Sequence, residues 1–492
     1  MCAQAVLEGY TGFDRMPIAG EWRAGRAGRT RQDTDPYSGE VLLEIPQANA
    51  DDLDEAYRAA REAQPKWAAR PAFERARVLE RAARILADRE EELAGWLCRE
   101  AGATRPRAGL ELSLVQAVTR MAAEQADRIS TFQAVGSDLP DKENRVYRRP
   151  AGVVAVISPW NFPVQLSNRS VAPALALGNA VVLKPAGDTP VTGGLFLARV
   201  YEEAGLPPGL LSVVVGAGRD IGDAIVEHDI PRVVSFTGST PVGEGIAAKA
   251  GLKRLALELG GNGPLVVLDD ADLDRAVPAA LFGSYVHQGQ VCMATNRVIV
   301  DAALHDAFVE RFTAGAAALR HGDPGEEGTQ IGPVINASQL DSIRDKVSRS
   351  VADGAELVLG GEPDGPAGQV LPPHVLLGGN TVTTAAEEVF GPVATIIRAQ
   401  DEEHALRLAN DTPYGLSSAV CTRDEDRGLR FALRVEAGMT HVNDTTVHDD
   451  AHSAFGGEKD SGLGRFGGEW AVDEFTTHHW ISFQHAARDY PY

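Results

Sequence analysis

The stretch Val153-Val154-Ala155-Val156-Ile157 is a continuous run of small and β-branched side chains. A run with no polar alternation is typical of a strand that is buried on both faces of a parallel sheet. Further strands follow at intervals, separated by helical patterns near 165–177, 190–204 and 219–227. We expect these strands at 180–184, 211–215 and 232–236. The repetition predicts an α/β, doubly wound sheet.

A second α/β unit is predicted to begin near residue 264. Its apolar runs indicate strands at 264–268, 298–300, 355–359, 371–377 and 393–398. Helical patterns lie between these runs, at 272–287, 303–320 and 337–352. Two domains, each with its own sheet, fit this order, and they suit a chain of 492 residues, which is too long for one ordinary core.

The N-terminal region precedes both units. Turn signals predict short strands over 15–46, and apolar residues at helical spacing predict helices over 51–104 and 108–128. We expect the arginine-rich faces of these helices to be solvent-exposed. Two polar, extended segments, 130–149 and 476–486, are predicted to be peripheral strands, and the first has the character of an edge strand that pairs across an oligomer interface.

Composition excludes several classes of protein. The net charge is -22, which disfavours non-specific nucleic-acid binding through a basic surface. The four cysteines, at positions 2, 98, 292 and 421, form no CxxC pair, which argues against a zinc ribbon, an iron–sulfur cluster or a disulfide framework. No signal peptide or spanning helix is visible, so we expect a cytoplasmic protein without a membrane partner.

Two residues have a context that suggests covalent chemistry. Cys292 lies in the short polar segment His287-Gln288-Gly289-Gln290-Val291-Cys292, and Glu258 precedes the glycine pair of Leu259-Gly260-Gly261. A thiol that attacks a carbonyl and a carboxylate that activates water describe an acyl-enzyme oxidation or hydrolysis. Cys98 and Cys421 are predicted to be core residues, and Cys2 lies near the chain end.

Polar loops follow several strands of the first predicted sheet, where ligands of open α/β sheets collect. Asn161, in Pro159-Trp160-Asn161-Phe162-Pro163, offers an amide N–H for an oxyanion hole. Lys184 ends another strand and can bind ribose hydroxyls or phosphate. Gly238 and Ser239 open a helix whose free N–H groups favour a phosphate.

These motifs, with Glu387-Glu388-Val389-Phe390-Gly391-Pro392 and the segment 455–462, occur in one order along the chain. Together they resemble the NAD(P)-dependent aldehyde dehydrogenase superfamily over essentially the whole chain. Residues 165–173 and 441–444 are similar to the benzaldehyde/vanillin dehydrogenase branch.

The resemblance implies a role for each motif. Cys292 is expected to attack the aldehyde carbon, Asn161 to hold the oxyanion, and Glu258 to activate water for release of the acid. The expected cofactor-binding residues are Trp160, Lys184, Gly238, Ser239, Glu388 and Phe390. The expected substrate-lining residues are Phe162, Leu166, Arg169 and Phe455, whose aromatic rings suit a benzaldehyde-like substrate. Arg169 could instead face solvent or pair with a carboxylate.

The family fold implies a division of the chain. It places a cofactor-binding domain in 1–128 and 149–258 and a catalytic domain in 259–470. Two segments, 129–148 and 471–492, are expected to form a small β oligomerisation domain of a homodimer or homotetramer.

One departure from the family pattern concerns the cofactor. Many NAD-preferring members carry a glutamate directly after Lys-Pro-Ala, whereas this chain has Gly187-Asp188. Repulsion of a 2′-phosphate is then weak, so we predict NAD as cofactor with NADP tolerated.

Other functions remain open from the sequence. A cofactor-independent thiol acyltransferase or hydrolase also uses Cys292 and Glu258, and an aliphatic aldehyde dehydrogenase shares every motif. The segment His448-Asp449-Asp450-Ala451-His452 invites a metal site. We instead expect an acidic loop over the substrate mouth, because the proposed chemistry needs no metal.

Overall fold

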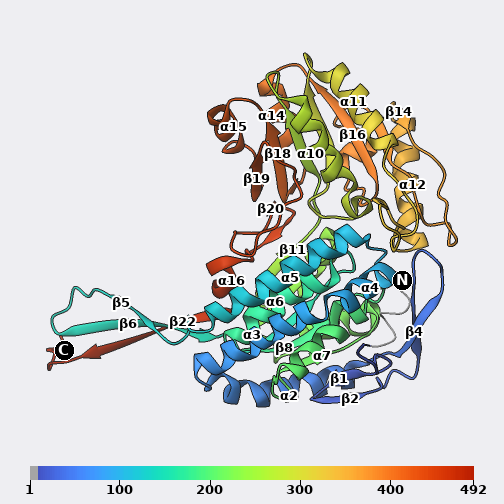
Figure 1. Ribbon diagram of the computed structural model, residues 1–492. Helices are drawn as coiled ribbons and strands as arrows, with labels where there is room; N and C mark the ends of the chain where they lie inside the picture. The colour runs from blue at the N-terminus through green and yellow to red at the C-terminus, as the bar shows by residue number, and fades with distance from the viewer. Residues whose placement is uncertain (1–8, 492) are drawn as a thin grey trace.

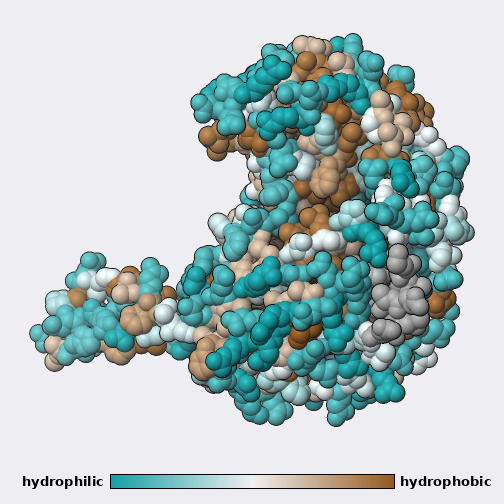
Figure 2. Space-filling view, viewed as in Figure 1, coloured by the Kyte–Doolittle hydropathy of each residue, from teal (hydrophilic) through white to brown (hydrophobic). Residues whose placement is uncertain are grey.

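The computed structural model describes residues 9–491, so Cys2 lies outside the described part of the chain. Two helix-covered sheets form two bodies, and a narrow third sheet projects from the lower body as an arm (Figure 1). Hydrophobic residues gather in the recess where the two bodies meet (Figure 2). The predicted α/β architecture with two large sheets and a small β unit is therefore confirmed.

The first sheet has six strands in the order β21-β11-β10-β7-β8-β9. Their bounds are β7 (Val153–Ile157), β8 (Ala180–Lys184), β9 (Leu211–Val213), β10 (Val233–Thr237), β11 (Arg254–Glu258) and β21 (Gly462–Leu463). The chain runs from β7 outward to β9, then returns to the other side of β7 with β10. This reversal is a topological switch point, which places a crevice beyond the carboxyl ends of β7 and β10.

Strand β11 was not among the strands predicted from the sequence. It runs parallel to β10, with Thr237 opposite Glu258, so Glu258 is the last residue of a buried strand. Leu463 in turn pairs with Leu257 in the antiparallel edge strand β21. Gly462 and Leu463, which were expected to belong to the catalytic domain, therefore add an edge strand to the first sheet next to Glu258.

Helices cover both faces of this sheet. They are α2 (Ala50–Ala68), α3 (Ala72–Asp88), α4 (Glu90–Glu100), α5 (Arg105–Gln125), α6 (Pro163–Ala176), α7 (Phe196–Glu203), α8 (Asp223–Glu227) and α9 (Thr240–Lys249), with short turns η1 (Val191–Leu195) and η2 (Gly218–Gly222). Helix α5 begins three residues before its predicted start. No helix within residues 9–491 is long and apolar enough to cross a bilayer.

The expectation that the arginine-rich helix faces are solvent-exposed is wrong for two residues. Arg75 and Arg107 are 1% and 2% exposed. Arg75 donates hydrogen bonds to the carbonyl oxygens of Ala176 and Ala126, at 2.9 and 2.7 Å. A guanidinium has five N–H donors, so it can be buried where several carbonyl oxygens converge on it.

The second sheet has seven strands in the order β14-β15-β16-β13-β12-β18-β19. The strands are β12 (Gly263–Val267), β13 (Thr295–Asp301), β14 (Glu356–Leu359), β15 (His374–Leu377), β16 (Val393–Ala399), β18 (Ser417–Cys421) and β19 (Met439–Val442). The helices of this body are α10 (Leu273–Tyr285), α11 (His305–Ala317), α12 (Ala337–Ala352), α13 (Thr383–Ala386), α14 (Glu402–Asn410) and α15 (Glu425–Ala432). Cys98 in α4 and Cys421 in β18 are buried, as predicted.

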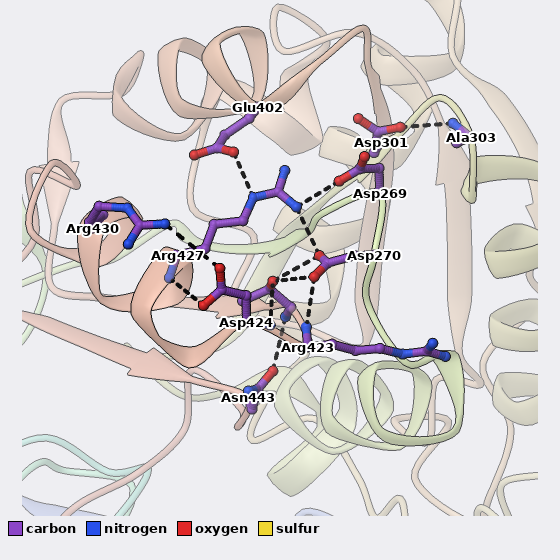
Figure 3. A network of polar contacts seen from close by, with 11 residues as sticks. Asp269, Asp270, Asp301, Ala303, Glu402, Arg423, Asp424, Arg427, Arg430 and Asn443 are labelled. Carbon is purple, nitrogen blue, oxygen red and sulfur yellow. Dashed lines mark hydrogen bonds and ion pairs between the residues drawn. The ribbon is translucent and has the colours of Figure 1, made fainter.

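A polar network joins the carboxyl ends of three strands in this body (Figure 3). The Arg427 guanidinium binds Asp269, Asp270 and Glu402 at 2.7–3.0 Å. Asp270 also accepts a hydrogen bond from the Thr422 hydroxyl, and the Thr422 N–H donates to Asn443 Oδ1 at 2.9 Å. The network fixes the segment that leaves β19, and this segment forms one wall of the site described below.

The arm consists of β5 (Phe132–Val135), β6 (Lys142–Pro150) and β22 (Thr476–Gln484). Strands β6 and β22 pair antiparallel from Thr476 opposite Pro150 to Gln484 opposite Lys142. Helix α16 (Gly468–Phe475) precedes β22, which starts at Thr476, the predicted start of the C-terminal strand. The remaining ladders pair β1 (Met16–Ile18) with β2 (Glu21–Arg23), β3 (Thr30–Thr34) with β4 (Val41–Pro46), and β17 (Tyr414–Gly415) with β20 (Glu458–Lys459).

Candidate active site

Cys292 lies in the connection between the short helix η3 (Val286–Gly289) and β13. His287 and Gln288 have φ of 51° and 58° in this turn, which is the left-handed region that L-residues rarely adopt. Gly289 follows with φ of 67°. Strained backbone of this kind persists where the surroundings fix it, and it occurs often at active sites. The turn presents Cys292 to the space between the two bodies.

Two cavities meet at Cys292. The larger has a volume of about 610 Å³ and the smaller about 220 Å³. Cys292 and Asn161 line both of them. The thiol and the amide therefore lie where a molecule in one cavity would face a molecule in the other.

Asn161 is held by two contacts at the carboxyl end of β7. Its Nδ2 donates a hydrogen bond of 3.0 Å to the carbonyl oxygen of Gln290, two residues before Cys292. The amide group has two N–H donors, so one remains for a ligand oxygen. The Asn161 carbonyl oxygen accepts a hydrogen bond from Arg107. The geometry suits an oxyanion hole beside the thiol.

Arg107 and Glu111 were not singled out by the sequence reading. They form a buried ion pair of 2.5 Å on α5, with side chains 1% and 0% exposed. Glu111 Oε1 accepts the N–H of Gln165 at 3.0 Å, and the Arg107 guanidinium lies 4.0 Å from the centre of the Phe162 ring. The pair thus supports the whole loop that carries Asn161. An opposite-charge pair at i and i+4 among Ala108, Leu112 and Val115 is the signal that could have revealed it.

The pKa values of Glu258 and Cys292 are both raised above their ordinary values. Burial raises the pKa of Glu258 to about 7, opposed by Arg169 and Arg465 and assisted by Asp449. Restricted contact with water and the charge of Glu258 raise the pKa of Cys292 to about 12. Neither Glu258 oxygen accepts a hydrogen bond from a described residue. A carboxylate with a pKa near neutrality and free oxygens is suited to general-base work.

The walls of the larger cavity are mainly apolar. Three expected substrate-lining residues, Phe162, Leu166 and Phe455, lie on them. The other apolar lining residues come from α5, α10, the Cys292 turn and the segment after β19: Leu110, Leu114, Pro278, Ala279, Phe282, Val291, Met293 and Val447. The cavity has the size and lining of a small-molecule site.

Arg169 does not line this cavity, contrary to the expectation. Its guanidinium carbon lies 4.7 Å from the ring centre of Phe455 and 4.6 Å from that of Phe466. Its Nη2 is 3.8 Å from Glu258 Oε2. Since α6 turns this side chain behind Phe455, the alternative pairing with a carboxylate is the one that the structure supports.

The smaller cavity gathers most of the expected cofactor residues. Trp160, Gly238, Ser239, Glu388 and Phe390 all line it. The rings of Trp160 and Phe390 pack edge to face, with centres 5.3 Å apart. Glu388 Oε1 accepts the Gly261 N–H at 2.9 Å, and burial raises the pKa of Glu388 to about 7. A carboxylate opposite an apolar wall suits a ribose hydroxyl pair next to a flat ring.

Lys184 lies apart from that cleft, at the carboxyl end of β8. It is 8% exposed, and burial together with the charge of Arg31 lowers its pKa to about 8, against the opposing effect of Asp188. Arg31 Nη2 pairs with Asp188 Oδ1 at 2.7 Å. A Cβ atom on Gly187 would lie 2.4 Å from Arg31 Nη1. The absence of a side chain at 187 therefore gives the Arg31 guanidinium its place beside Lys184.

The acidic segment after β19 contributes to the larger cavity. Asn443, Asp444, His448 and Asp449 line it, together with Gln165 and Arg275. Asp449 Oδ2 accepts a hydrogen bond of 3.4 Å from Gln165 Nε2. Within residues 9–491 no group of three or more His, Cys, Asp or Glu side chains is arranged to hold a metal ion.

A thiol and an amide that line both cavities suit an enzyme that forms covalent thiol intermediates. A family model described as the aldehyde dehydrogenase family matches residues 22–481, and the chain belongs to this family. It is 49% identical to a vanillin dehydrogenase of Corynebacterium glutamicum, over 96% of this chain and 99% of that protein. It is 45% identical to a benzaldehyde dehydrogenase of Bacillus subtilis, over 98% and 99%.

A solved structure agrees with these relatives. The NAD-dependent benzaldehyde dehydrogenase from Corynebacterium glutamicum superposes with a TM-score of 0.89 at 46% identity, covering 98% of this chain and 99% of that chain. The resemblance to the benzaldehyde and vanillin dehydrogenases, inferred from short motifs, is thereby confirmed.

Proposed function

We propose that this enzyme oxidises an aromatic aldehyde to its carboxylic acid with NAD, through a covalent thioester on Cys292. One observation carries the proposal: Cys292 and Asn161 line both the apolar cavity and the cleft of Glu388 and Phe390. An aldehyde bound in the first therefore presents its carbonyl carbon at the edge of the second. The names of the relatives support the same substrate class and cofactor.

The side chains divide the chemistry between them. The Cys292 sulfur adds to the aldehyde carbon, and the free N–H of Asn161 stabilises the oxygen anion that forms. The thiol proton must leave, and Glu258, with its pKa near 7, is the group that we assign to receive it. Nicotinamide cofactors supply hydride acceptance, the one capacity that these side chains lack. Glu258 must pass the thiol proton to solvent before the second step. The ionised carboxylate then removes a proton from water as the water oxygen adds to the thioester carbon and the sulfur leaves.

The cofactor is assigned to the cleft of Trp160, Gly238, Ser239, Glu388 and Phe390 and, outside this cleft, to Lys184 at the carboxyl end of β8. The cleft fits a dinucleotide, because the N-terminus of α9, which follows Ser239, offers free N–H groups to a phosphate. Glu388 and Lys184 would each hold a ribose. Because Gly187 leaves Arg31 beside Lys184, we also propose that NADP is tolerated.

The decisive experiment is an aldehyde panel of benzaldehyde, vanillin and a short alkanal, each with NAD and with NADP, followed by the absorbance of reduced cofactor. We expect the aromatic aldehydes to give the higher kcat/KM with NAD. An alkanal with the highest kcat/KM would overturn the aromatic assignment. Absence of cofactor binding in a direct titration would instead favour the thiol acyltransferase or hydrolase.

Two variants separate the assigned roles. Cys292→Ser should abolish hydride transfer, and full steady-state activity in this variant would reject the nucleophile. Glu258→Gln should leave a burst of reduced cofactor followed by slow turnover, because the thiol proton can also pass to solvent, whereas hydrolysis of the thioester loses its general base.

We further propose a homodimer or homotetramer that uses the arm of β5, β6 and β22, in a cytoplasmic location. The arm exposes large apolar side chains that a monomer would leave in water: Phe132, Val135, Trp480 and Phe483. Light scattering of the full chain and of Trp480→Asp tests this: a monomeric parent protein would contradict it.

A further inference from the structure

Arg169 lies against the carboxylate of Glu258 without making a hydrogen bond to it. The Arg169 side chain is 4% exposed, and its Nη2 is 3.8 Å from Glu258 Oε2 and 3.1 Å from Thr237 Oγ1. Its Nε and Nη1 have no hydrogen-bond partner within residues 9–491. The cation therefore acts on Glu258 through space and leaves both carboxylate oxygens available.

Two aromatic rings hold the guanidinium in this position. The rings of Phe455 and Phe466 both contact it, with ring centres 4.7 and 4.6 Å from the guanidinium carbon. The ring faces attract a cation, which offsets part of the cost of removing it from water. Since Phe455 also lines the aldehyde cavity, the same ring separates the substrate from the arginine.

Asp449 opposes Arg169. Its carboxyl is buried, lines the aldehyde cavity and accepts a hydrogen bond from Gln165. Burial raises the pKa of Asp449, and Arg169 lowers it. Arg169 thus favours the charged form of both carboxyls, whereas the charge of Asp449 raises the pKa of Glu258.

Within residues 9–491, Arg465 is the one further charged side chain that shifts the pKa of Glu258. It lowers that pKa, but its guanidinium is already paired with Glu458 and bonded to the carbonyl oxygens of Gly457 and Gly464. Cys292 brings no charge near pH 7, because burial and the charge of Glu258 raise the pKa of its thiol to about 12. Arg169 and Asp449 are consequently the pair that can set the charge of Glu258.

We propose that Arg169 and Asp449 are positioning residues with opposite effects: Arg169 keeps Glu258 ionised for attack by water, and Asp449 keeps it able to take up a proton. The inference rests on the proposed role of Glu258 as the general base. Neither residue contacts the reacting carbon in this scheme. Together they would place the protonation of Glu258 within the working pH range, so that it can accept the thiol proton, release it to solvent and then accept a proton from water.

The test is the pH dependence of kcat for benzaldehyde and NAD in three variants. Arg169→Met should move the acidic limb upward by at least about one pH unit and lower kcat at pH 7 about tenfold, with recovery at higher pH. Asp449→Asn should move the same limb downward. Arg169→Lys, which keeps the charge, should hold the limb within about half a unit of the parent protein.

A merely structural role would lower kcat by the same factor at every pH and leave the limb in place, and that result would overturn the proposal. If Arg169→Met does not fold, the near-isosteric Asp449→Asn remains decisive, because an unmoved or upward-shifted limb contradicts the proposal by itself. A different result would show that the proposed function fails: a Glu258→Gln variant with the full turnover and the same acidic limb as the parent protein.

Discussion

Asn161 Nδ2 lies 3.0 Å from the carbonyl oxygen of Gln290, and this hydrogen bond joins the loop after β7 to the turn that carries Cys292. The two residues come from different bodies of the molecule and are 129 positions apart. The bond orients the amide so that its second N–H can serve the oxygen of a substrate bound to Cys292.

Removal of this amide should lower kcat while the protein stays folded. We expect Asn161→Ala to lower kcat for benzaldehyde about 10²- to 10³-fold, as loss of one oxyanion donor does elsewhere. Asn168→Ala is the matched control, since Asn168 is also a buried amide of the same region but bonds Thr119 and Tyr201 and lines neither cavity. A loss of less than threefold at position 161 would contradict the oxyanion assignment.

The ion pair of Arg107 and Glu111 should be costly to break from one side. Arg107→Met leaves a carboxylate at 0% exposure without its partner, and we expect a loss of about 3–5 kcal/mol in unfolding free energy. The double variant Arg107→Met/Glu111→Leu should recover part of this loss, because it removes the isolated charge. Denaturant titrations measure the unfolding free energy of each variant. Equal stability of the single and double variants would show that the isolated charge is not the source of the loss.

Stability should depend on pH through Glu258. The folded-state pKa of about 7 lies above the ordinary value of 4.5, so the folded state binds this proton more tightly than the unfolded chain does. The ionised Glu258 carboxylate lowers the free energy of unfolding by on the order of 3 kcal/mol. This loss is absent below pH 4.5, grows as the pH rises towards 7 and is complete above it. Glu258→Gln should therefore raise the melting temperature relative to the parent protein at pH 8.5 but not at pH 4.5.

Arg31 should govern tolerance of NADP. Its guanidinium lies beside Lys184 because Gly187 has no side chain, so Arg31→Gln should weaken NADPH binding about tenfold while NADH binding changes little. Quenching of tryptophan fluorescence measures both affinities directly. Arg434→Gln is the control, since Arg434 has similar exposure and an equally short ion pair, at 2.7 Å with Glu403, in the other body.

The parent enzyme provides a further check on the cofactor prediction. A ratio of kcat/KM for NAD over NADP above about a thousandfold, or roughly 4 kcal/mol, would contradict NADP tolerance.

The helices and strands were largely predictable because their signals are local. Buried parallel strands such as β7 and β8 read as unbroken apolar runs, and the helices between them repeat apolar residues every three or four positions. Strand β11 was not predicted because the charged residues Arg254 and Glu258 stand at its two ends and leave only three apolar residues between them. Helix α16 was not predicted, since its eight residues are too few for a clear helical period.

The sequence by itself determined the order of the two α/β units, placed Lys184 at the end of a strand and Asn161 in the loop after one, and marked Cys292 and Glu258 by their neighbours. These follow from neighbours in the chain and from the rule that ligands gather at the carboxyl ends of parallel strands. Only the tertiary structure decided what each charge faces. Arg169 meets Glu258, and Arg31 meets Asp188, across 89 and 157 positions, as 258 minus 169 and 188 minus 31 give. Such contacts depend on how the packed elements lie in space, which no local pattern encodes.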